Sequence, residues 1–281
     1  MPDWWIVDGP AHAHHDQMKD DRILPLTRGV AYAIVPFLVV AFAVLYPVPG
    51  DTGRLFAWRI ASTLTAMVLG SAYLGGAYFF LRAARATAWH TVKGGFVPVG
   101  VFATLMGVAT VVHWSRFDHQ HVAFWLWVLL YFTTPFLIFW TWLRNRRHDL
   151  PASPSDDLLG VPVQRLIAAL GGLAAGTGLV LFLFPASAAQ WWPWTLTPLT
   201  ARVLGAVFSL GLAGVGVLLD RRTSSARLPL QVALVMLALI LVAGVRAHAQ
   251  LAAGNVLTWV FVVGFAAVTA GAGYLLVRMR P

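Results

Sequence analysis

The residues with the greatest capacity for chemistry are four histidines in two short segments between long apolar runs. His113 and His248 are separated by 135 positions, and His119 and His121 closely follow the first of them. Imidazole nitrogens ligate divalent metals, and two facing histidines can hold the iron of a b-type haem. The spacing fits a haem between His113 and His248, or a metal held by these histidines with Asp118. We favour a third interpretation, in which histidines near the C-terminal ends of helices act as caps.

Arginines in the same and neighbouring segments could bind an anionic group. Arg202 is the most distinctive, because it lies about a turn and a half inside an apolar run. It either extends to the membrane surface, pairs with Asp51 or Asp118, or holds an anionic headgroup or substrate. We expect a ligand-binding rim that consists of Arg59, His113, Arg116, Asp118, Arg202, Arg246 and His248.

Aromatic side chains are concentrated in the apolar run 119–143, which contains Trp125, Trp127, Tyr131 and Trp140. Aromatic residues are common at membrane interfaces and in helix packing, and we expect most of these side chains to serve there. The alternative is that these four line a pocket for an apolar ligand.

The composition identifies the class of protein that must position these residues. Of the 281 residues, 59% are hydrophobic and 11% are charged, whereas an ordinary soluble domain is about a quarter charged. The absence of Cys and Glu excludes thiolate metal sites, iron–sulfur clusters, cysteine nucleophiles and glutamate chemistry. We expect an all-α integral membrane protein with eight transmembrane helices, placed at 29–48, 59–82, 94–114, 121–143, 163–185, 197–219, 228–247 and 256–278.

The distribution of Lys and Arg predicts the orientation in the membrane. Fifteen lie in the N-terminal segment, the even-numbered loops and the tail, and five lie on the opposite rim. Because positive residues are retained on the cytoplasmic side, both termini are expected in the cytoplasm, at a bacterial plasma (inner) membrane. The charges lie between apolar runs and not on a basic face of a folded module, so nucleic acid is not an expected partner.

The two halves of the chain resemble each other. Residues 62–73 align without gaps with residues 197–208, and the same offset of 135 residues places His113 on His248. We expect a segment 1–28, a first four-helix repeat at 29–148, a linker at 149–162, and a second repeat at 163–281. Each repeat contains an even number of helices, so the two should be parallel. Small residues on the fifth and eighth helices predict close helix packing. They are Gly171, Gly172, Ala174, Ala175 and Gly176, which include a Gly172-x-x-x-Gly176 spacing, and Gly264, Gly271 and Gly273.

Two motifs carry a resemblance to known sequences. They are Pro198-Leu-Thr-Ala-Arg-x-Leu-Gly205 and His113-Trp-Ser-Arg-Phe-Asp118. The chain resembles uncharacterised bacterial multi-pass membrane proteins that contain duplicated four-helix units. The resemblance implies this architecture and leaves the activity open.

Three functions remain as expectations. We favour a binding or accessory role towards membrane lipid, an apolar small molecule or a partner membrane protein, which includes a second copy of the chain. The first rival is a facilitator for a neutral solute, with a path lined by Thr63, Thr65, Ser71, Thr133, Thr134, Ser209 and Thr258. The second rival is a haem- or metal-dependent membrane enzyme. Ser115, His113 and Asp118 are close in sequence, but proximity in a loop does not assemble a catalytic triad.

Overall fold

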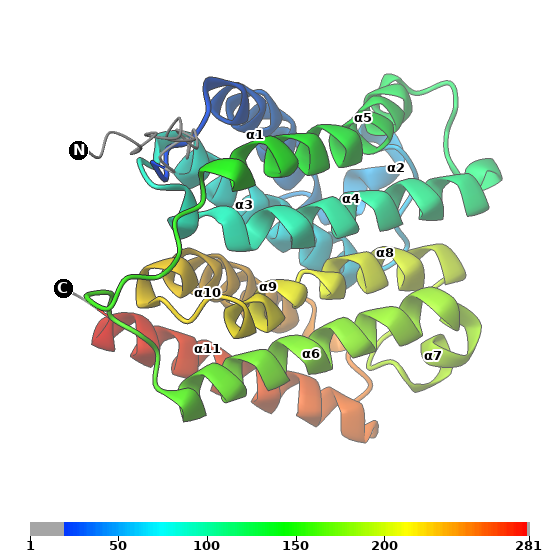
Figure 1. Ribbon diagram of the computed structural model, residues 1–281. Coiled ribbons are helices and arrows are strands. Elements are labelled where there is room, and N and C mark those ends of the chain that lie inside the picture. The colour runs from blue at the N-terminus through cyan, green and yellow to red at the C-terminus, as the bar shows by residue number, and fades with distance from the viewer. Residues whose placement is uncertain (1–19, 280–281) are drawn as a thin grey trace, which may run out of the picture.

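Among residues 20–279, eight helices are long and apolar enough to cross a membrane, and they make up most of this part of the chain (Figure 1). This computed structural model describes residues 20–279, so most of the predicted N-terminal segment, residues 1–19, lies outside the described residues. Within that range the protein is all-helical, as predicted. In hydrocarbon a helix satisfies its own backbone hydrogen bonds, which is why each apolar run folds in this way. The composition and these helices together fit a multi-pass membrane protein.

The eight helices have the following bounds. They are α1 (Pro25–Leu45), α3 (Thr63–Arg85), α4 (Lys93–Val112), α5 (Val122–Asn145), α6 (Val161–Leu183), α8 (Pro198–Ser209) continued by α9 (Leu212–Val215) and η5 (Gly216–Leu218), α10 (Thr223–Arg246) and α11 (Val256–Arg278). Short elements connect them: η1 (Pro49–Asp51), α2 (Thr52–Leu55), η2 (Trp89–Thr91), η3 (Trp114–Arg116), η4 (Arg146–His148), α7 (Pro185–Trp191) and η6 (His248–Gln250).

Local residue chemistry sets several helix starts. Pro25 is the first residue of α1, a position at which the missing N–H costs nothing, so α1 begins four residues earlier than predicted. The Ser62 hydroxyl accepts the Thr65 N–H and caps α3. Thr197 and Thr200 form a reciprocal capping box at α8.

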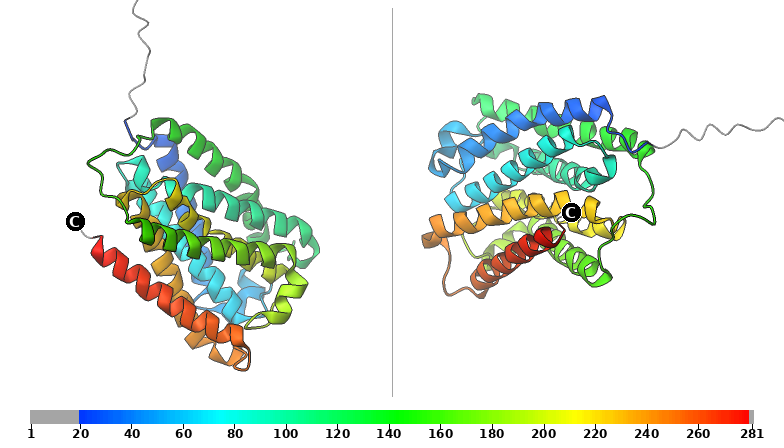
Figure 2. Two further views of the ribbon diagram at one scale, coloured as in Figure 1. Left: turned by 60° about the horizontal axis from the view of Figure 1, so that its bottom comes forward. Right: turned by 90° about the vertical axis from the view of Figure 1, so that its left-hand side faces the viewer.

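The bundle has two ends of different character. At the basic end, α1, α4, α6 and α10 begin, and α3, α5 and α11 finish. In the right panel of Figure 2 this end lies at the right, where α1 and α10 begin. Its loops carry most of the arginines, and the opposite end carries the loops that contain His113 and His248.

Helix contacts join the two halves of the chain. Within the halves, α1 packs on α3, α4 on α5, α6 on α8, and α10 on α11. Between the halves, α10 packs on α3, and α4 packs on α8. The largest buried cluster comes mainly from the first half, with Trp89, Tyr73 and Phe124 among its members, and it extends into α8 and α10.

The closest backbone approach lies between α6 and α8–α9, and of the small residues predicted to pack closely on α6 it uses Gly171. A Cβ atom built on Gly178 would lie 2.6 Å from the Gly205 carbonyl oxygen, and one on Gly171 would lie 2.5 Å from that of Gly211. Gly176 has no atom within 4 Å of such a Cβ. The predicted Gly172–Gly176 seam is therefore wrong, because that face of α6 is exposed.

The predicted close packing of α11 is also wrong. Cβ atoms built on Gly264 and Gly271 would meet nothing within 4 Å, and one on Gly273 would meet only an ordinary contact with Leu234 at 4.0 Å. Most of α11 is exposed on the surface of the bundle, so its glycines do not serve a close approach within the described chain.

Candidate functional site

The four histidines predicted as metal ligands are His113, His119, His121 and His248. They lie at the end of the bundle opposite the basic end, and each forms a hydrogen bond with a different partner. His119 Nε2 pairs with the Trp114 carbonyl oxygen at 3.0 Å. His121 Nε2 pairs with the backbone carbonyl of Arg54, and its Nδ1 caps α5. His248 Nδ1 lies 3.1 Å from the carbonyl oxygen of Val245. Among residues 20–279, no three His, Cys, Asp or Glu side chains gather in a group that could hold a metal ion. The structure thus does not bring the predicted ligands together.

His113 forms a contact with Arg202 that the sequence did not predict. Arg202 Nη1 donates to His113 Nε2 at 2.7 Å, which joins α8 to the end of α4. Burial lowers the pKa of His113, and the positive charges of Arg202 and Arg116 lower it further. The neutral ring can accept a hydrogen bond from the guanidinium N–H, whereas the charged ring cannot. Arg202 is therefore used to link the two halves of the bundle.

The His113–Arg202 contact predicts a pH-dependent stability. Because the pKa of His113 is lowered on folding, its stabilising contribution is present above the ordinary value of about 6.5 and is lost as the pH falls through the folded value. We expect the unfolding midpoint to fall between about pH 7.5 and about pH 5.5. The variant His113→Gln keeps an acceptor that does not titrate and should show a smaller fall. Equal falls in the two proteins, measured by circular dichroism in detergent, would contradict this role.

The remaining rim residues do not converge on one site. Arg59, Arg116 and Asp118 are exposed. The Arg246 guanidinium donates to the backbone carbonyls of Tyr46 and Pro47 at 2.9 and 3.3 Å. The predicted ligand-binding rim is thus a set of separate contacts and exposed charges.

The four aromatic residues predicted as an alternative pocket divide into two groups. Trp127 and Tyr131 are buried in a packed cluster, where Trp127 Nε1 donates to the Thr110 hydroxyl at 2.8 Å. Trp125 and Trp140 are about half exposed, at 54% and 46%. The space beside Tyr131 measures about 40 Å³, which is close to the volume of a single water. The four side chains do not line one cavity of ligand size.

The hydroxyls proposed for a solute path are mostly bonded to the backbone. Ser71, Thr133 and Ser209 donate to carbonyls three or four residues earlier in their own helices. Thr258 donates to the Ala252 carbonyl. Thr65 accepts the Trp194 indole N–H at 2.8 Å. These contacts stabilise the helices and their packing and leave these groups unavailable as a continuous polar lining.

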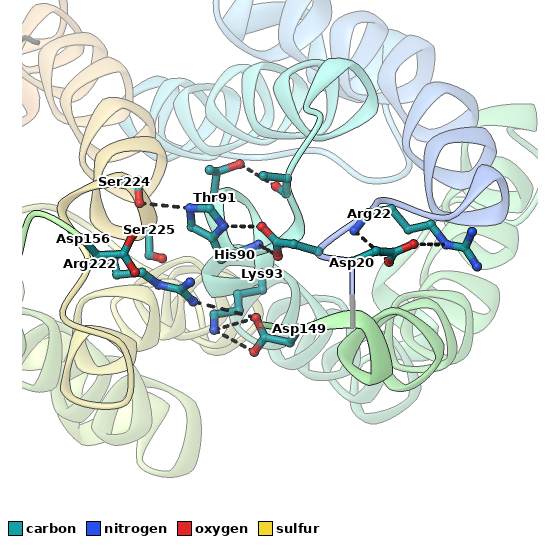
Figure 3. A network of polar contacts seen from close by, with 12 residues as sticks. Asp20, Arg22, His90, Thr91, Lys93, Asp149, Asp156, Arg222, Ser224 and Ser225 are labelled. Carbon is teal, nitrogen blue, oxygen red and sulfur yellow. Dashed lines mark hydrogen bonds and ion pairs between the residues drawn. The ribbon is translucent and has the colours of Figure 1, made fainter. Parts of the chain in front are cut away.

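A cluster of charged side chains lies at the basic end, in a place that the sequence did not single out (Figure 3). Lys93 Nζ lies 2.7 Å from Asp149 Oδ2 and 2.9 Å from Asp220 Oδ2. Two guanidinium nitrogens of Arg222 donate hydrogen bonds to Asp220: Nε lies 3.0 Å from Oδ1, and Nη2 lies 2.7 Å from Oδ2. The start of α4, the end of α5 and the start of α10 are joined here. Two cations thus share two carboxylates between the halves of the chain.

Burial and hydrogen bonding act against each other at Asp220. Burial raises the pKa of this carboxyl, but hydrogen bonds from Arg222 and Lys93 outweigh it and hold the pKa well below the ordinary value. The bonds to Asp220 also raise the pKa of Arg222, although burial opposes that change. Only 4% of the Arg222 side chain is exposed. Asp220 and Arg222 are both ionised at neutral pH, and each compensates the charge of the other.

A pocket of about 630 Å³ opens beside this cluster. Its charged lining comprises four basic residues and two acidic ones: Lys93, Arg146, Arg221, Arg222, Asp149 and Asp220. Its apolar lining comprises Leu150, Pro151, Ala152, Leu158, Leu218 and Leu219. Leu219 is 93% exposed, and the Arg146 guanidinium lies over the Trp142 ring at 4.9 Å. The pocket therefore combines an excess of positive charge with exposed apolar side chains.

The segment before α1 is held against the same end. Asn145 Nδ2 donates to the Arg22 carbonyl at 2.8 Å, and its Oδ1 accepts from Leu24 N–H and the Thr27 hydroxyl. The Arg28 guanidinium donates to two backbone carbonyls, those of Ala84 and Ala86, at 2.9 and 2.8 Å. These bonds satisfy carbonyls at the C-terminal end of α3 and fix the chain between α3 and α5.

Comparison with known proteins gives no match: no family model, no curated protein and no solved structure is similar to the chain.

Proposed function

We propose that the protein is a membrane protein that binds an anionic lipid in the pocket at the basic end. The observation that carries this proposal is the lining of the pocket, in which basic residues outnumber acidic ones and exposed leucines surround them. A phospholipid with an anionic headgroup presents a negative charge next to apolar chains. The binding role expected at the rim is thus assigned to the opposite end, where charged side chains surround a cavity.

The division of charge within the pocket supports this assignment. Asp149 and Asp220 are satisfied by Lys93 and Arg222, with which they form close ion pairs. Arg146 and Arg221 are exposed at the pocket and supply the excess positive charge. An anionic headgroup near the two exposed guanidinium groups would gain charge-assisted hydrogen bonds, and leucines beside it would contact the acyl chains.

We infer that the basic end faces the cytoplasm of a bacterial cell and that the protein lies in the inner membrane. Arginine and lysine are concentrated at this end, and the positive-inside rule favours its retention on the cytoplasmic side. The anionic lipids of that leaflet are attracted by basic residues near the helix ends. The bacterial assignment rests on the resemblance to bacterial multi-pass proteins.

We further propose that the molecule arose by duplication of a four-helix unit, with the copies parallel. Repeated backbone contacts at offsets of 134 to 136 residues support this proposal. Asp118 N–H donates to the Ala57 carbonyl at 3.0 Å, and Ala252 N–H donates to that of Pro193 at 2.9 Å. The Trp89 N–H donates to the Asp21 carbonyl, as the Thr223 N–H donates to that of Asp157. The Trp125 indole N–H donates to the His119 carbonyl, as the Trp259 indole N–H donates to that of Ala253. The antiparallel bridge between Arg22 and Ala88 likewise corresponds to the bridge between Leu158 and Arg222.

Native mass spectrometry of the purified full chain tests the lipid proposal. Phosphatidylglycerol and phosphatidylcholine with identical acyl chains are titrated into the protein in mild detergent. We expect tighter binding of phosphatidylglycerol. The double variant Arg146→Gln/Arg221→Gln should weaken that binding roughly 10- to 30-fold, because each basic residue near the membrane surface contributes about 1 kcal/mol.

A matched double variant separates the pocket from general surface charge. Arg144 lies over Trp140 as Arg146 lies over Trp142, and Arg85 is an exposed arginine at the same end. Neither Arg144 nor Arg85 lines the pocket. Arg85→Gln/Arg144→Gln removes the same charge and should change the affinity less than threefold. Equal losses in the two double variants, or equal binding of the two lipids, would refute a headgroup site in this pocket.

A further inference from the structure

Three side chains from distant parts of the chain form a linear hydrogen-bonded series at the basic end. The Asp21 carboxylate contacts His90 Nδ1, and His90 Nε2 lies 3.0 Å from the Ser224 hydroxyl. Asp21 precedes α1, His90 lies in η2, and Ser224 is the second residue of α10. Figure 3 shows the His90 ring directed at Ser224. An acid, an imidazole and a hydroxyl in this order have the arrangement required for nucleophilic catalysis.

The acid of the series is fixed by the backbone as well as by its ring partner. Asp21 Oδ1 accepts the backbone N–H of His90 at 3.0 Å. The Asp21 N–H donates to the His148 carbonyl at 2.9 Å, and its own carbonyl accepts the Trp89 N–H at 2.6 Å. The residue has a φ of 54°, in the left-handed region, where Asp is tolerated better than most residues. Its carboxylate is therefore held in one position against the imidazole.

The acid and the imidazole of the series are largely buried and its hydroxyl is exposed, as nucleophilic catalysis requires. The side chains of Asp21 and His90 are 11% and 19% exposed, whereas Ser224 is exposed at the surface. With the Nδ1 proton directed at the carboxylate, Nε2 has the lone pair that accepts the hydroxyl proton. A buried acid orients the ring, and the nucleophile remains accessible to a substrate.

The position of Ser224 indicates the class of substrate. The helix α10 has 24 residues and so extends about 36 Å, which exceeds the hydrocarbon thickness of about 30 Å. The first turn of α10 therefore reaches the headgroup region, where the ester bonds of glycerolipids lie. The positive end of the α10 dipole also favours negative charge that develops on oxygen in that turn.

We propose that Ser224, His90 and Asp21 hydrolyse carboxylic esters of membrane amphiphiles. Ser224 Oγ attacks the ester carbonyl carbon while His90 Nε2 takes the hydroxyl proton, and the carbonyl π electrons move to oxygen. The intermediate collapses with loss of the alcohol, which takes the proton from Nε2, and an acyl ester remains on Ser224. Water then attacks that ester and gives its proton to Nε2, the carboxylic acid leaves, and Ser224 regains a proton. Ser224 and His90 are the catalytic residues, and Asp21 is a positioning residue.

The nearest alternative triad in the sequence does not assemble in this way. His113, Ser115 and Asp118 lie close together in the sequence. In the structure, His113 Nε2 is occupied by the Arg202 guanidinium, and Asp118 is exposed. Ser115 is exposed too and so provides a control serine for the series at the basic end.

A fluorophosphonate probe tests the proposal on the full-length protein in mild detergent. Fluorophosphonates react with serines that a neighbouring base activates, and the modified peptide is located by mass spectrometry. We expect one adduct, on Ser224, that is lost in Ser224→Ala and retained in Ser115→Ala. His90→Gln should slow labelling at least 100-fold. Absence of an adduct on Ser224 in the parent protein, or an unchanged labelling rate in His90→Gln, would overturn the proposal.

The role of Asp21 needs a readout that separates positioning from folding. Asp21→Asn keeps the size and tolerates the left-handed backbone, but it loses the charge that orients the ring. We expect labelling at Ser224 to slow at least 100-fold at an unchanged unfolding temperature, with partial rescue in Asp21→Glu. Hydrolysis of p-nitrophenyl butyrate should follow the same order. Equal labelling rates in the parent protein, Asp21→Asn and Asp21→Glu would refute the assignment of Asp21 as a positioning residue.

Lipid binding and hydrolysis are separable in the experiment. Ser224 does not line the pocket that Arg146 and Arg221 border. Ser224→Ala should therefore leave phosphatidylglycerol binding unchanged, and Arg146→Gln/Arg221→Gln should leave labelling of Ser224 by the small probe unchanged. Failure of one proposal would leave the other standing.

Discussion

Replacement of Asp220 by Asn is expected to lower the free energy of unfolding by about 3–5 kcal/mol. Asp220 is the carboxylate that both Lys93 and Arg222 contact, and Arg222 is nearly completely buried. Without it, the Arg222 guanidinium would remain buried beside an uncharged amide, with only the distant Asp149 carboxylate, at 3.8 Å, to compensate its charge. Loss of one partner of a buried pair costs more than the pair itself contributes, because the other charge is left uncompensated. Titration of a denaturing detergent into mild micelles, followed by circular dichroism, measures the change.

Asp51 provides the matched control for Asp220. It pairs with Arg54 at 3.7 Å, and both side chains are more than half exposed. An exposed pair of this kind contributes about 0–1 kcal/mol, so Asp51→Asn should change the unfolding free energy by no more than that. A loss at Asp220 as small as the loss at Asp51 would mean that the charged cluster does not hold the basic end together.

Replacement of Gly178 by Ala is expected to destabilise the bundle by about 1–3 kcal/mol. The added Cβ would lie 2.6 Å from the Gly205 carbonyl oxygen and 3.1 Å from the Ser209 nitrogen. Both are backbone atoms, which cannot move aside as a flexible side chain can. The helices α6 and α8 would have to separate and lose van der Waals contact along their length.

Gly176 tests whether this cost comes from packing. It lies two residues away on α6, and a Cβ there would have no neighbour within 4 Å. Gly176→Ala should be neutral or stabilising, by up to about 1 kcal/mol, because Ala favours the helix more than Gly does. Destabilisation of equal size at the two positions would contradict the close contact between α6 and α8.

The membrane class and the number of helices could be predicted because they depend on composition and on run length alone. A run of about 20 apolar residues between charged loops is stable in lipid as a helix, and the described part of the chain contains eight such helices. Boundaries were less accurate. The helix α10 begins at Thr223, five residues before the predicted start, since Arg227 and Pro229 are tolerated in its first turns.

The packing partners of individual glycines could not be predicted, because they depend on how each helix is rotated. Gly172 and Gly176 have the familiar spacing, yet they face away from α8. Gly171 and Gly178 are seven residues apart, a spacing that also keeps two residues on one helix face. The sequence-based prediction includes Gly171 and omits Gly178, whose contact with Gly205 depends on the rotation of α6.

The site residues were missed because they come from separate loops. Lys93, Asp149 and Asp220 meet only after α4, α5 and α10 have packed, and sequence distance gives no indication of this. One signal was present: Asp149 closely follows Arg146 and Arg147, and Asp220 directly precedes Arg221 and Arg222. Such a carboxylate is expected to pair with a cation, and attention to these residues would have shifted the predicted site from the rim to the basic end.

Photocrosslinking from Leu219 tests the lipid-binding pocket most directly. Leu219 lines the pocket and is 93% exposed, and Val245, at the opposite end of α10, is 75% exposed and serves as the reference position. A benzophenone amino acid is placed at each position in protein embedded in phosphatidylglycerol–phosphatidylcholine bilayers. The lipid adducts are then identified by mass spectrometry. We predict that phosphatidylglycerol adducts at Leu219 exceed the share of that lipid in the bilayer, whereas adducts at Val245 match it. Adducts at both positions that simply match the bilayer composition would contradict a site for anionic lipid.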